Sequence, residues 1–199
     1  PGLTAATGMD ALTHAVEAYV STMATPTTDA AAIKSIELIS KYLREAVAHG
    51  DNVKVRDMMA HAEYLAGIAF NNASLGYVHS MAHQLGGFYN LPHGVCNAIL
   101  LPYVETYNKQ VVPERFADIA RAMGENVEGL SREEAADKAI DAIKKIAADI
   151  GIPSGLKELG AREEDLELLA ENAMQDICRL TNPRELSKEE IIEIYRKAM

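Results

Sequence analysis

The sequence predicts an all-α fold, a bundle-like arrangement of helices. Along most of the 199 residues, apolar side chains recur at intervals of three and four positions, which is the helical period. No segment alternates apolar and polar side chains as a half-buried strand does, and no internal repeat is present. Glycine, proline and helix-capping residues separate the periodic segments, so the chain divides into successive helices.

Five helices are predicted in the first part of the chain. The second is introduced by TPTTD, where Thr27, Thr28 and Asp29 are natural caps, and the third begins at Asp51 or Asn52. The fourth stops before Pro92, because the residue that precedes a proline disfavours helical geometry. The expected helices run from Met9 to Ser21, from the TPTTD caps to Gly50, from Asp51 or Asn52 to about Gly76, over 78–90, and over 93–108 with a bend at Pro102.

Four further helices are predicted after residue 112. Ser131 and Glu134 form the sequence pattern of a capping box, and Ser187 precedes the closing helix with Glu190 three positions later. The expected segments are 113–124, 131–151, 162–180 and 187–199, with a break at 151–153 and a turn at 182–184. We expect one domain over 1–199 with a soft sub-boundary near 124–131, after which Leu, Ile and Ala alternate with Glu and Lys in a solvated-face pattern.

The composition excludes several classes of partner. The formal net charge is −10 and no Lys/Arg cluster interrupts it, so a nucleic acid or an anionic membrane is not expected as a partner. Cys96 and Cys178 are too few for a disulfide framework, which suits a reducing compartment. There is no signal-peptide pattern and no apolar run long enough to span a bilayer, so we expect a cytoplasmic protein. The chain opens at Pro1 without Met, which suggests a part of a longer protein.

Five residues form a set that is typical of a mononuclear metal site. Asp10 and His14 are four positions apart, as are His79 and His83, so each pair projects from one helix face. His93 follows Pro92 at the start of a helix. Three imidazoles and a carboxylate suit a divalent ion such as Fe²⁺ or Zn²⁺, with a position open for substrate.

Spacing does not decide which of His79 and His83 binds the ion, and one histidine is expected to act beside the metal or as a proton carrier. A lone Asp-x-x-x-His or His-x-x-x-His is more often structural. His49 and His61 are expected to be ordinary helix residues, and a core or pocket position is the alternative for His61, which lies on a Met/Ala/Tyr-rich helix. The combination of five residues favours the metal site.

The surrounding motifs resemble a known family. Gly8-x-Asp10-Ala11-x-x-His14, followed by Gly76-x-x-His79-x-x-x-His83-x-x-Gly86 and then Pro92-His93-Gly94, is similar to the iron-containing (group III) alcohol dehydrogenases. The resemblance covers the whole chain, and its second motif, NASLGYVHSMAHQLGGFYNLPHGVCNAILLPYV, looks most like the 1,3-propanediol and methanol dehydrogenase type.

The resemblance implies roles for individual residues. Asp10, His14, His79 and His93 would be the metal ligands, with iron favoured over zinc. His83 would lie near the nicotinamide as a proton carrier. Phe70 and Cys178 match positions at the substrate and cofactor cleft, although core packing explains Phe70 equally well and an inert buried thiol explains Cys178.

The resemblance also implies a second domain. Enzymes of this family combine an N-terminal α/β nucleotide-binding domain with an all-α C-terminal metal domain, and this chain looks like the second alone. Its 13 glycines form no GxGxxG motif. The implied function is NAD(P)-linked interconversion of a short-chain alcohol or diol and its aldehyde, with the metal as a Lewis acid and NAD or NADP held mainly by the absent domain.

Three consequences and two alternatives follow from this interpretation. The isolated chain would bind metal but turn over little or no alcohol, its partners would be the alcohol or aldehyde and the absent domain, and exposed apolar surface would favour a homo-oligomer. The alternatives are a metal-assisted hydrolase, which needs no absent domain, and a non-catalytic helical domain that binds metal for stability. Hydrolytic activity of the chain alone would favour the first alternative.

Overall fold

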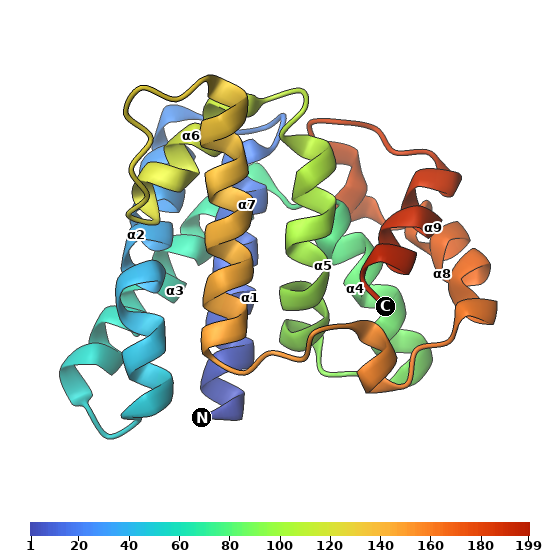
Figure 1. Ribbon diagram of the computed structural model, residues 1–199, viewed down its shortest axis with the longest axis horizontal. Coiled ribbons are helices and arrows are strands. Elements are labelled where there is room, and N and C mark those ends of the chain that lie inside the picture. The colour runs from blue at the N-terminus through green and yellow to red at the C-terminus, as the bar shows by residue number, and fades with distance from the viewer.

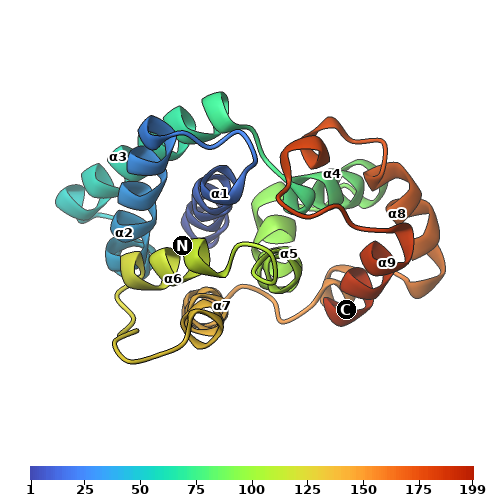
Figure 2. The ribbon, with the colours of Figure 1, turned by 90° about the horizontal axis from the view of Figure 1, so that it is seen from above.

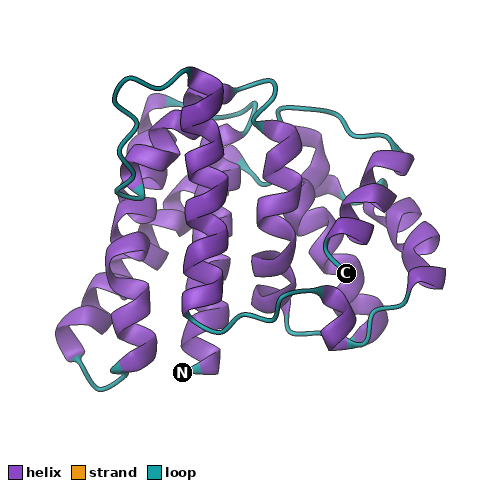
Figure 3. Cartoon of the chain, viewed as in Figure 1, coloured by secondary structure: helices purple, strands orange, loops and turns teal.

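A computed structural model describes residues 1–199 and consists of helices and loops without any strand, which confirms the all-α prediction (Figure 3). Nine α-helices and three short 3₁₀ helices follow one another along the chain. In order they are α1 Gly2–Val20, α2 Pro26–Ala48, α3 Val53–Ala73, α4 Tyr77–Tyr89, α5 His93–Asn108, α6 Pro113–Ala122, α7 Arg132–Asp149, η1 Leu156–Leu159, η2 Glu163–Asp165, α8 Leu166–Ala173, η3 Ile177–Thr181 and α9 Lys188–Lys197. None of these helices combines the length and the apolar character needed to cross a bilayer.

The helices form two groups on either side of α5. Helices α1, α2, α3, α6 and α7 lie on one side, and α4, α8 and α9 lie on the other (Figures 1 and 2). Helix α5 packs against α1 and α7 in the first group and against α4 and α9 in the second. The two groups therefore share one hydrophobic core, and α5 fixes the position of α4 relative to α1.

Several helix borders confirm the capping patterns. The side chains of Ser131 and Ser187 each accept a hydrogen bond from the backbone N–H of the glutamate three positions later. The carboxylate of each glutamate accepts a hydrogen bond from the backbone N–H of its serine, so both predicted capping boxes are present. Helix α2 begins earlier than predicted, with Thr25 as its cap. Pro26 stands at the first helical position, where its missing N–H costs nothing.

Two further predictions of helix borders are wrong. Helix α1 begins at Gly2, seven residues before Met9, because Gly2 to Gly8 continue the helix without a proline or a strong cap to stop them. The predicted helix over 162–180 is divided into η2, α8 and η3. It breaks at Asp176, whose carboxylate caps η3 by accepting a hydrogen bond from the backbone N–H of Cys178.

Small residues let α1 approach its neighbours closely. Gly8 faces Leu43 of α2, and a Cβ at Gly8 would overlap the Leu43 side chain. Buried alanines continue this surface along α1 and α3, so the backbones of these helices lie near each other. The close packing holds α1 in a fixed position, and α1 carries two of the predicted site residues.

A buried polar cluster joins the two groups of helices. Asn182, from the turn after η3, exchanges two side-chain hydrogen bonds with Asn108 of α5 at 2.7 and 3.0 Å. Asn108 also donates to Glu105 at 3.0 Å, and the Glu105 carboxyl is fully buried with one oxygen unbonded. Burial, with a contribution from the charge of Glu17, raises the pKa of Glu105 to about 8. Glu105 therefore carries a proton at neutral pH.

We predict that Glu105→Gln flattens the pH dependence of stability. The folded protein retains a proton that the unfolded chain releases, because the pKa of Glu105 rises from 4.5 to about 8 on folding. Wild-type stability should therefore fall as the pH rises through this window, by at most about 1.4 kcal/mol per pH unit from this group. The glutamine variant should show less of this fall and should exceed wild type in stability at about pH 8.

Urea denaturation at several pH values between about 5 and 8 measures this difference. Glu114→Gln, on an exposed part of α6, is the matched control and should retain the wild-type pH dependence. An unchanged slope in the Glu105 variant would contradict the assignment.

Candidate metal centre

The five residues of the predicted metal set come together where α1, α4 and α5 meet. Asp10 and His14 lie on α1, His79 and His83 on α4, and His93 is the first residue of α5. Asp10 Oδ1 lies 3.4 Å from His93 Nε2 and 3.7 Å from His79 Nε2. Asp10, His14 and His79 each offer a ligand atom within 4.8 Å of the others. Three separate helices therefore present their polar groups to one point.

The rings of the cluster stack on one another. His14 lies between Phe70 and His79, with ring centroids 4.4 and 4.7 Å apart and the planes nearly parallel. His83 stacks on His93 at 5.4 Å. Phe70 therefore forms one wall of the cluster.

The cluster is closed on one side and open on the other. His79 is buried, whereas the side chains of His83 and His93 are each 41% exposed. A small molecule can therefore approach from the side of His83 and His93 but not through α1.

The pKa shifts of Asp10 and His14 leave a carboxylate and one neutral imidazole, whereas His79, with its pKa raised to about 9, must lose a proton to bind an ion. Burial alone would raise the pKa of Asp10, but hydrogen bonds from His79 and Asn97 and the charge of His14 outweigh it and lower this pKa to about 2. Burial, together with the charge of His79, lowers the pKa of His14 to about 4. Asp10 is therefore ionised and His14 is neutral at neutral pH, which are the forms that bind metal ions.

Glu17 of α1 is a functional residue that the sequence analysis missed. It is buried, and its two oxygens bind different groups of α4: Oε1 accepts the backbone N–H of Val78 at 2.7 Å, and Oε2 contacts Nδ1 of His79. Burial opposes the charged form of His79, yet the Glu17 carboxylate outweighs it and raises the pKa of His79 to about 9. The contact places Nε2 of His79 toward Asp10. The sequence spacing could have indicated Glu17, since it is three positions after His14 on the same helix face.

Asn97 was also missed, although it follows His93 by one helical turn. Its buried Nδ2 lies 2.6 Å from Asp10 Oδ1, 3.0 Å from His93 Nε2 and 3.1 Å from His79 Nε2, while its Oδ1 has no partner. One amide thus touches three members of the cluster and holds them at short distances from one another.

Asp176 is the third residue that the sequence analysis missed. It binds Nδ1 of His83 at 2.8 Å, and Cys178 lies close enough for the three side chains to present ligand-type atoms within 4.8 Å. Hydrogen bonds from the Cys178 backbone and from His83 outweigh burial and lower the pKa of Asp176. Burial raises the pKa of the Cys178 thiol to about 12, so this thiol is not a ready nucleophile. No local pattern marks Asp176, because its partner lies far away in the sequence.

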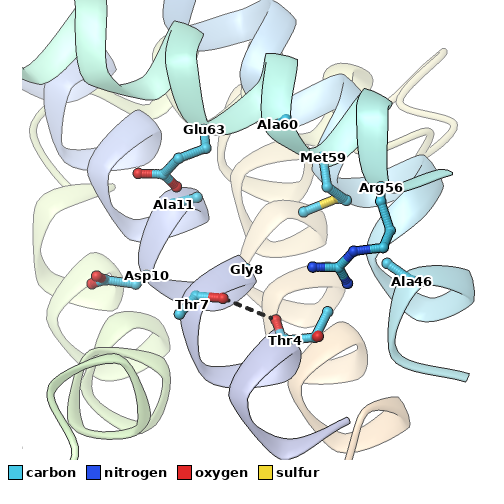
Figure 4. Close-up of a pocket in the computed structure, with 10 residues that line it drawn as sticks. All are labelled: Thr4, Thr7, Gly8, Asp10, Ala11, Ala46, Arg56, Met59, Ala60 and Glu63. Atoms are coloured by element: carbon cyan, nitrogen blue, oxygen red, sulfur yellow. Dashed lines mark hydrogen bonds between the residues drawn. The ribbon is translucent and has the colours of Figure 1, made fainter. Parts of the chain in front are cut away.

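A cavity of about 400 Å³ opens beside the cluster, between α1, α2 and α3 (Figure 4). Of the predicted set it touches Asp10 alone, and Glu63 and Arg56 of α3 line the opposite wall. Because no histidine lines this cavity, we do not assign it to the substrate.

The donor set fits a divalent first-row metal ion. A carboxylate with several imidazoles is hard enough for Fe²⁺ and nitrogen-rich enough for Zn²⁺. The buried Nδ1 of His14 has no hydrogen-bond partner in the protein, and the ligand atoms already lie close together before any ion draws them in. By contrast, His49 and His61 are exposed and lie outside the cluster, so the alternative of a core or pocket position for His61 is wrong.

Comparison with known proteins identifies relatives over the full length of the chain. The model of the Fe-containing alcohol dehydrogenase family, C-terminal, matches residues 4–199. The 1,3-propanediol dehydrogenase of Citrobacter freundii is 60% identical over 98% of this chain and 51% of its own length. The NAD-dependent methanol dehydrogenase of Bacillus methanolicus is 52% identical over 100% of this chain and 52% of its own.

A solved structure agrees with these matches. The crystal structure of a 1,3-propanediol oxidoreductase matches with a TM-score of 0.99 and 58% identity, covering 100% of this chain and 52% of that one. The chain therefore spans about half the length of the relatives it matches, and the resemblance and all-α fold predicted from its motifs are confirmed.

Gly94 allows α5 to begin against α1. A Cβ at this position would overlap the backbone carbonyl of Ala6 and would lie 3.3 Å from the Cβ of Asp10. Since backbone atoms cannot rotate away, only glycine permits this approach, which places His93 beside Asp10.

We predict that Gly94→Ala destabilises the fold by about 1–3 kcal/mol, the usual cost of forcing atoms into a packed interface. Gly87→Ala is the matched control, because Gly87 lies within α4 and a Cβ there would meet nothing within 4 Å. That variant should gain up to about 1 kcal/mol from helix propensity. Chemical denaturation measures both, and equal stability of the two variants would contradict the close approach.

Proposed function

Because the chain belongs to the Fe-containing alcohol dehydrogenase family, we propose that it is the metal-binding half of an NAD(P)-linked alcohol dehydrogenase. The reaction converts a short-chain alcohol or diol and NAD(P)⁺ into the aldehyde, NAD(P)H and a proton, and it is reversible. The observation that carries this proposal is the convergence of Asp10, His14, His79 and His93, from three helices, in a chain that matches the family over residues 4–199.

We assign these four residues as the metal ligands. The short separations of Asp10 Oδ1 from His79 Nε2 and His93 Nε2 support this set, as does the stacking of His14 on His79. The same donors suit iron and zinc, and the family to which the chain belongs favours Fe²⁺. When bound, a divalent ion supplies a Lewis acid that polarises the oxygen of the alcohol or aldehyde.

The protein side chains position the reacting groups. Glu17 contacts Nδ1 of His79 and so orients Nε2 of this ring. Asn97 Nδ2 contacts Asp10 Oδ1 and His93 Nε2, and it would give up these contacts when the two atoms bind an ion. Phe70 stacks on the ring of the ligand His14 and covers one side of it with an apolar surface. Cys178, beside His83 and Asp176, borders the open side, where the substrate and the nicotinamide would meet.

His83 is the proton carrier in this proposal. Its side chain is 41% exposed and stacks on His93, so it reaches both the cluster and solvent. It would accept the proton that the alcohol oxygen loses while the carbon-bound hydride passes to the nicotinamide, and it would return a proton in the reverse direction.

The nicotinamide cofactor would be bound mainly by an N-terminal α/β domain that precedes these residues in the longer protein. A relative at 52% identity is an NAD-dependent methanol dehydrogenase, which supports NAD as the first cofactor to test, with NADP as the alternative. The two cysteines are free, which supports a cytoplasmic location.

Metal content tests the ligand assignment. The wild-type chain, loaded anaerobically with Fe²⁺ or Zn²⁺ and then desalted, should retain about one ion per chain. His14→Ala and His79→Ala should lose it, and Glu17→Gln should weaken binding by about 10–100-fold, because the carboxylate orients a ligand. His61→Ala, on exposed α3, is the control and should retain the ion. Full metal content in His14→Ala or His79→Ala would refute the assignment.

Turnover measurements test whether this chain supplies the metal site and an N-terminal domain supplies the cofactor site. The 199-residue chain should bind metal without measurable NAD(P)-linked alcohol oxidation, whereas a fusion to the N-terminal half of 1,3-propanediol dehydrogenase should oxidise short alcohols and diols. The same fusion carrying His79→Ala is the control and should be inactive. Robust NAD-dependent oxidation by the unfused chain would contradict the proposal, and so would an inactive, metal-loaded fusion.

A further inference from the structure

The carboxylate of Asp176 lies against the exposed end of the histidine cluster. Its Oδ2 is 2.8 Å from Nδ1 of His83, although the two residues are 93 positions apart. The side chain of Asp176 is only 15% exposed, whereas that of His83 is 41% exposed. A mostly buried carboxylate thus contacts one edge of an accessible imidazole and leaves the other edge free.

The protein fixes the Asp176 carboxylate on both sides. Its second oxygen, Oδ1, accepts the backbone N–H of Cys178 at 2.9 Å and so caps the short helix η3. Farther along the same segment, the Thr181 hydroxyl donates to the carbonyl of Leu75, just before α4, at 2.6 Å. The segment 176–181 is therefore attached to the beginning of α4 and, through Asp176, to His83 two turns later.

The contact decides which nitrogen of His83 carries the proton. An ionised carboxylate only accepts hydrogen bonds, so Nδ1 of His83 must be the donor. In the neutral ring the other nitrogen, Nε2, then has a free lone pair, and it makes no hydrogen bond within the protein. An exposed histidine without such a partner favours the opposite tautomer, with the proton on Nε2.

The neighbouring histidine of α4 provides a parallel. His79 also directs Nδ1 to a carboxylate, that of Glu17, and turns Nε2 toward Asp10. One helix thus carries two histidines, one turn apart, each held by a carboxylate from a different part of the chain. His79 is buried at the centre of the cluster, whereas His83 has solvent beside it.

We propose that Asp176 is a positioning residue that holds His83 in the Nδ1-protonated tautomer, with Nε2 free to accept a proton from the substrate. The role of this tautomer in catalysis rests on the proposed dehydrogenase function. The presence of the tautomer depends only on the contact between Asp176 and His83. A proton acceptor works only when its lone pair is already present and aimed at the reacting group, and Asp176 satisfies the first condition before substrate binds.

Nitrogen NMR of the histidine rings tests the proposal on the full 199-residue chain without metal, substrate or turnover. Long-range ¹H–¹⁵N spectra at a pH where His83 is neutral distinguish a protonated ring nitrogen from an unprotonated one, and His83→Gln identifies the signals. In wild type we expect Nδ1 of His83 in the protonated range and Nε2 in the unprotonated range. His61, which lies 3.8 Å from Asp57 without a hydrogen bond, should show the opposite pattern.

Asp176→Ala should shift His83 to the Nε2-protonated pattern, while the His79 signals remain those of wild type. Asp176→Asn preserves an accepting oxygen and should retain part of the wild-type pattern, and its thermal unfolding shows whether the segment still folds. A majority Nε2-protonated His83 in wild type would overturn the proposal by itself, and so would an unchanged His83 pattern in a folded Asp176→Ala variant. The NMR experiment needs neither metal nor turnover. If the chain fails to bind metal or to oxidise alcohol, the proposed function fails, but the tautomer of His83 can still be read and the proposal for Asp176 still be tested.

Discussion

The buried carboxylate of Glu17 is the constraint on which the site depends. It caps the first turn of α4 through the Val78 N–H and contacts Nδ1 of His79, so one charged group sets both the position of a helix and the rotation of a ring. A carboxylate at a helix N-terminus is favoured by the helix dipole, which partly offsets its burial. Gly76 is required beside it, because a Cβ there would lie 2.9 Å from Glu17 Oε1 and 2.6 Å from Asn182 Oδ1.

Glu105 is the second buried glutamate of the interior, and it is neutral at neutral pH. Burial, with a contribution from the charge of Glu17, raises the pKa of Glu105 to about 8, and its carboxyl accepts a hydrogen bond from Asn108, whose amide is paired with that of Asn182. Two buried anions close together would repel each other in a medium of low dielectric constant. Protonation of Glu105 avoids this repulsion.

The site is built in two parts that differ in burial and packing. Asp10, His14 and His79 lie on helices that pack in the common core, and Gly94 brings the start of α5 within reach of α1. His83 depends on a short segment, 176–181, which is fixed by a few hydrogen bonds and has exposed Ile177 and Leu180 at its surface. A part packed in the core suits an ion that demands fixed distances, and a peripheral part suits proton exchange with substrate and solvent.

The sequence by itself determined the all-α fold, most helix borders, the family and the metal-type residue set, because these depend on periodicity, capping residues and short motifs that lie within one helix. The start of α1 and the break at Asp176 were missed, since a helix continues or stops according to contacts that local preference does not contain. The partners Glu17, Asn97 and Asp176 were decided by tertiary structure. Glu17 meets His79 and Asp176 meets His83 only after the chain has folded, because 62 and 93 positions separate the two members of each pair. Sequence spacing shows which side chains share a face, and packing alone brings faces of different helices together.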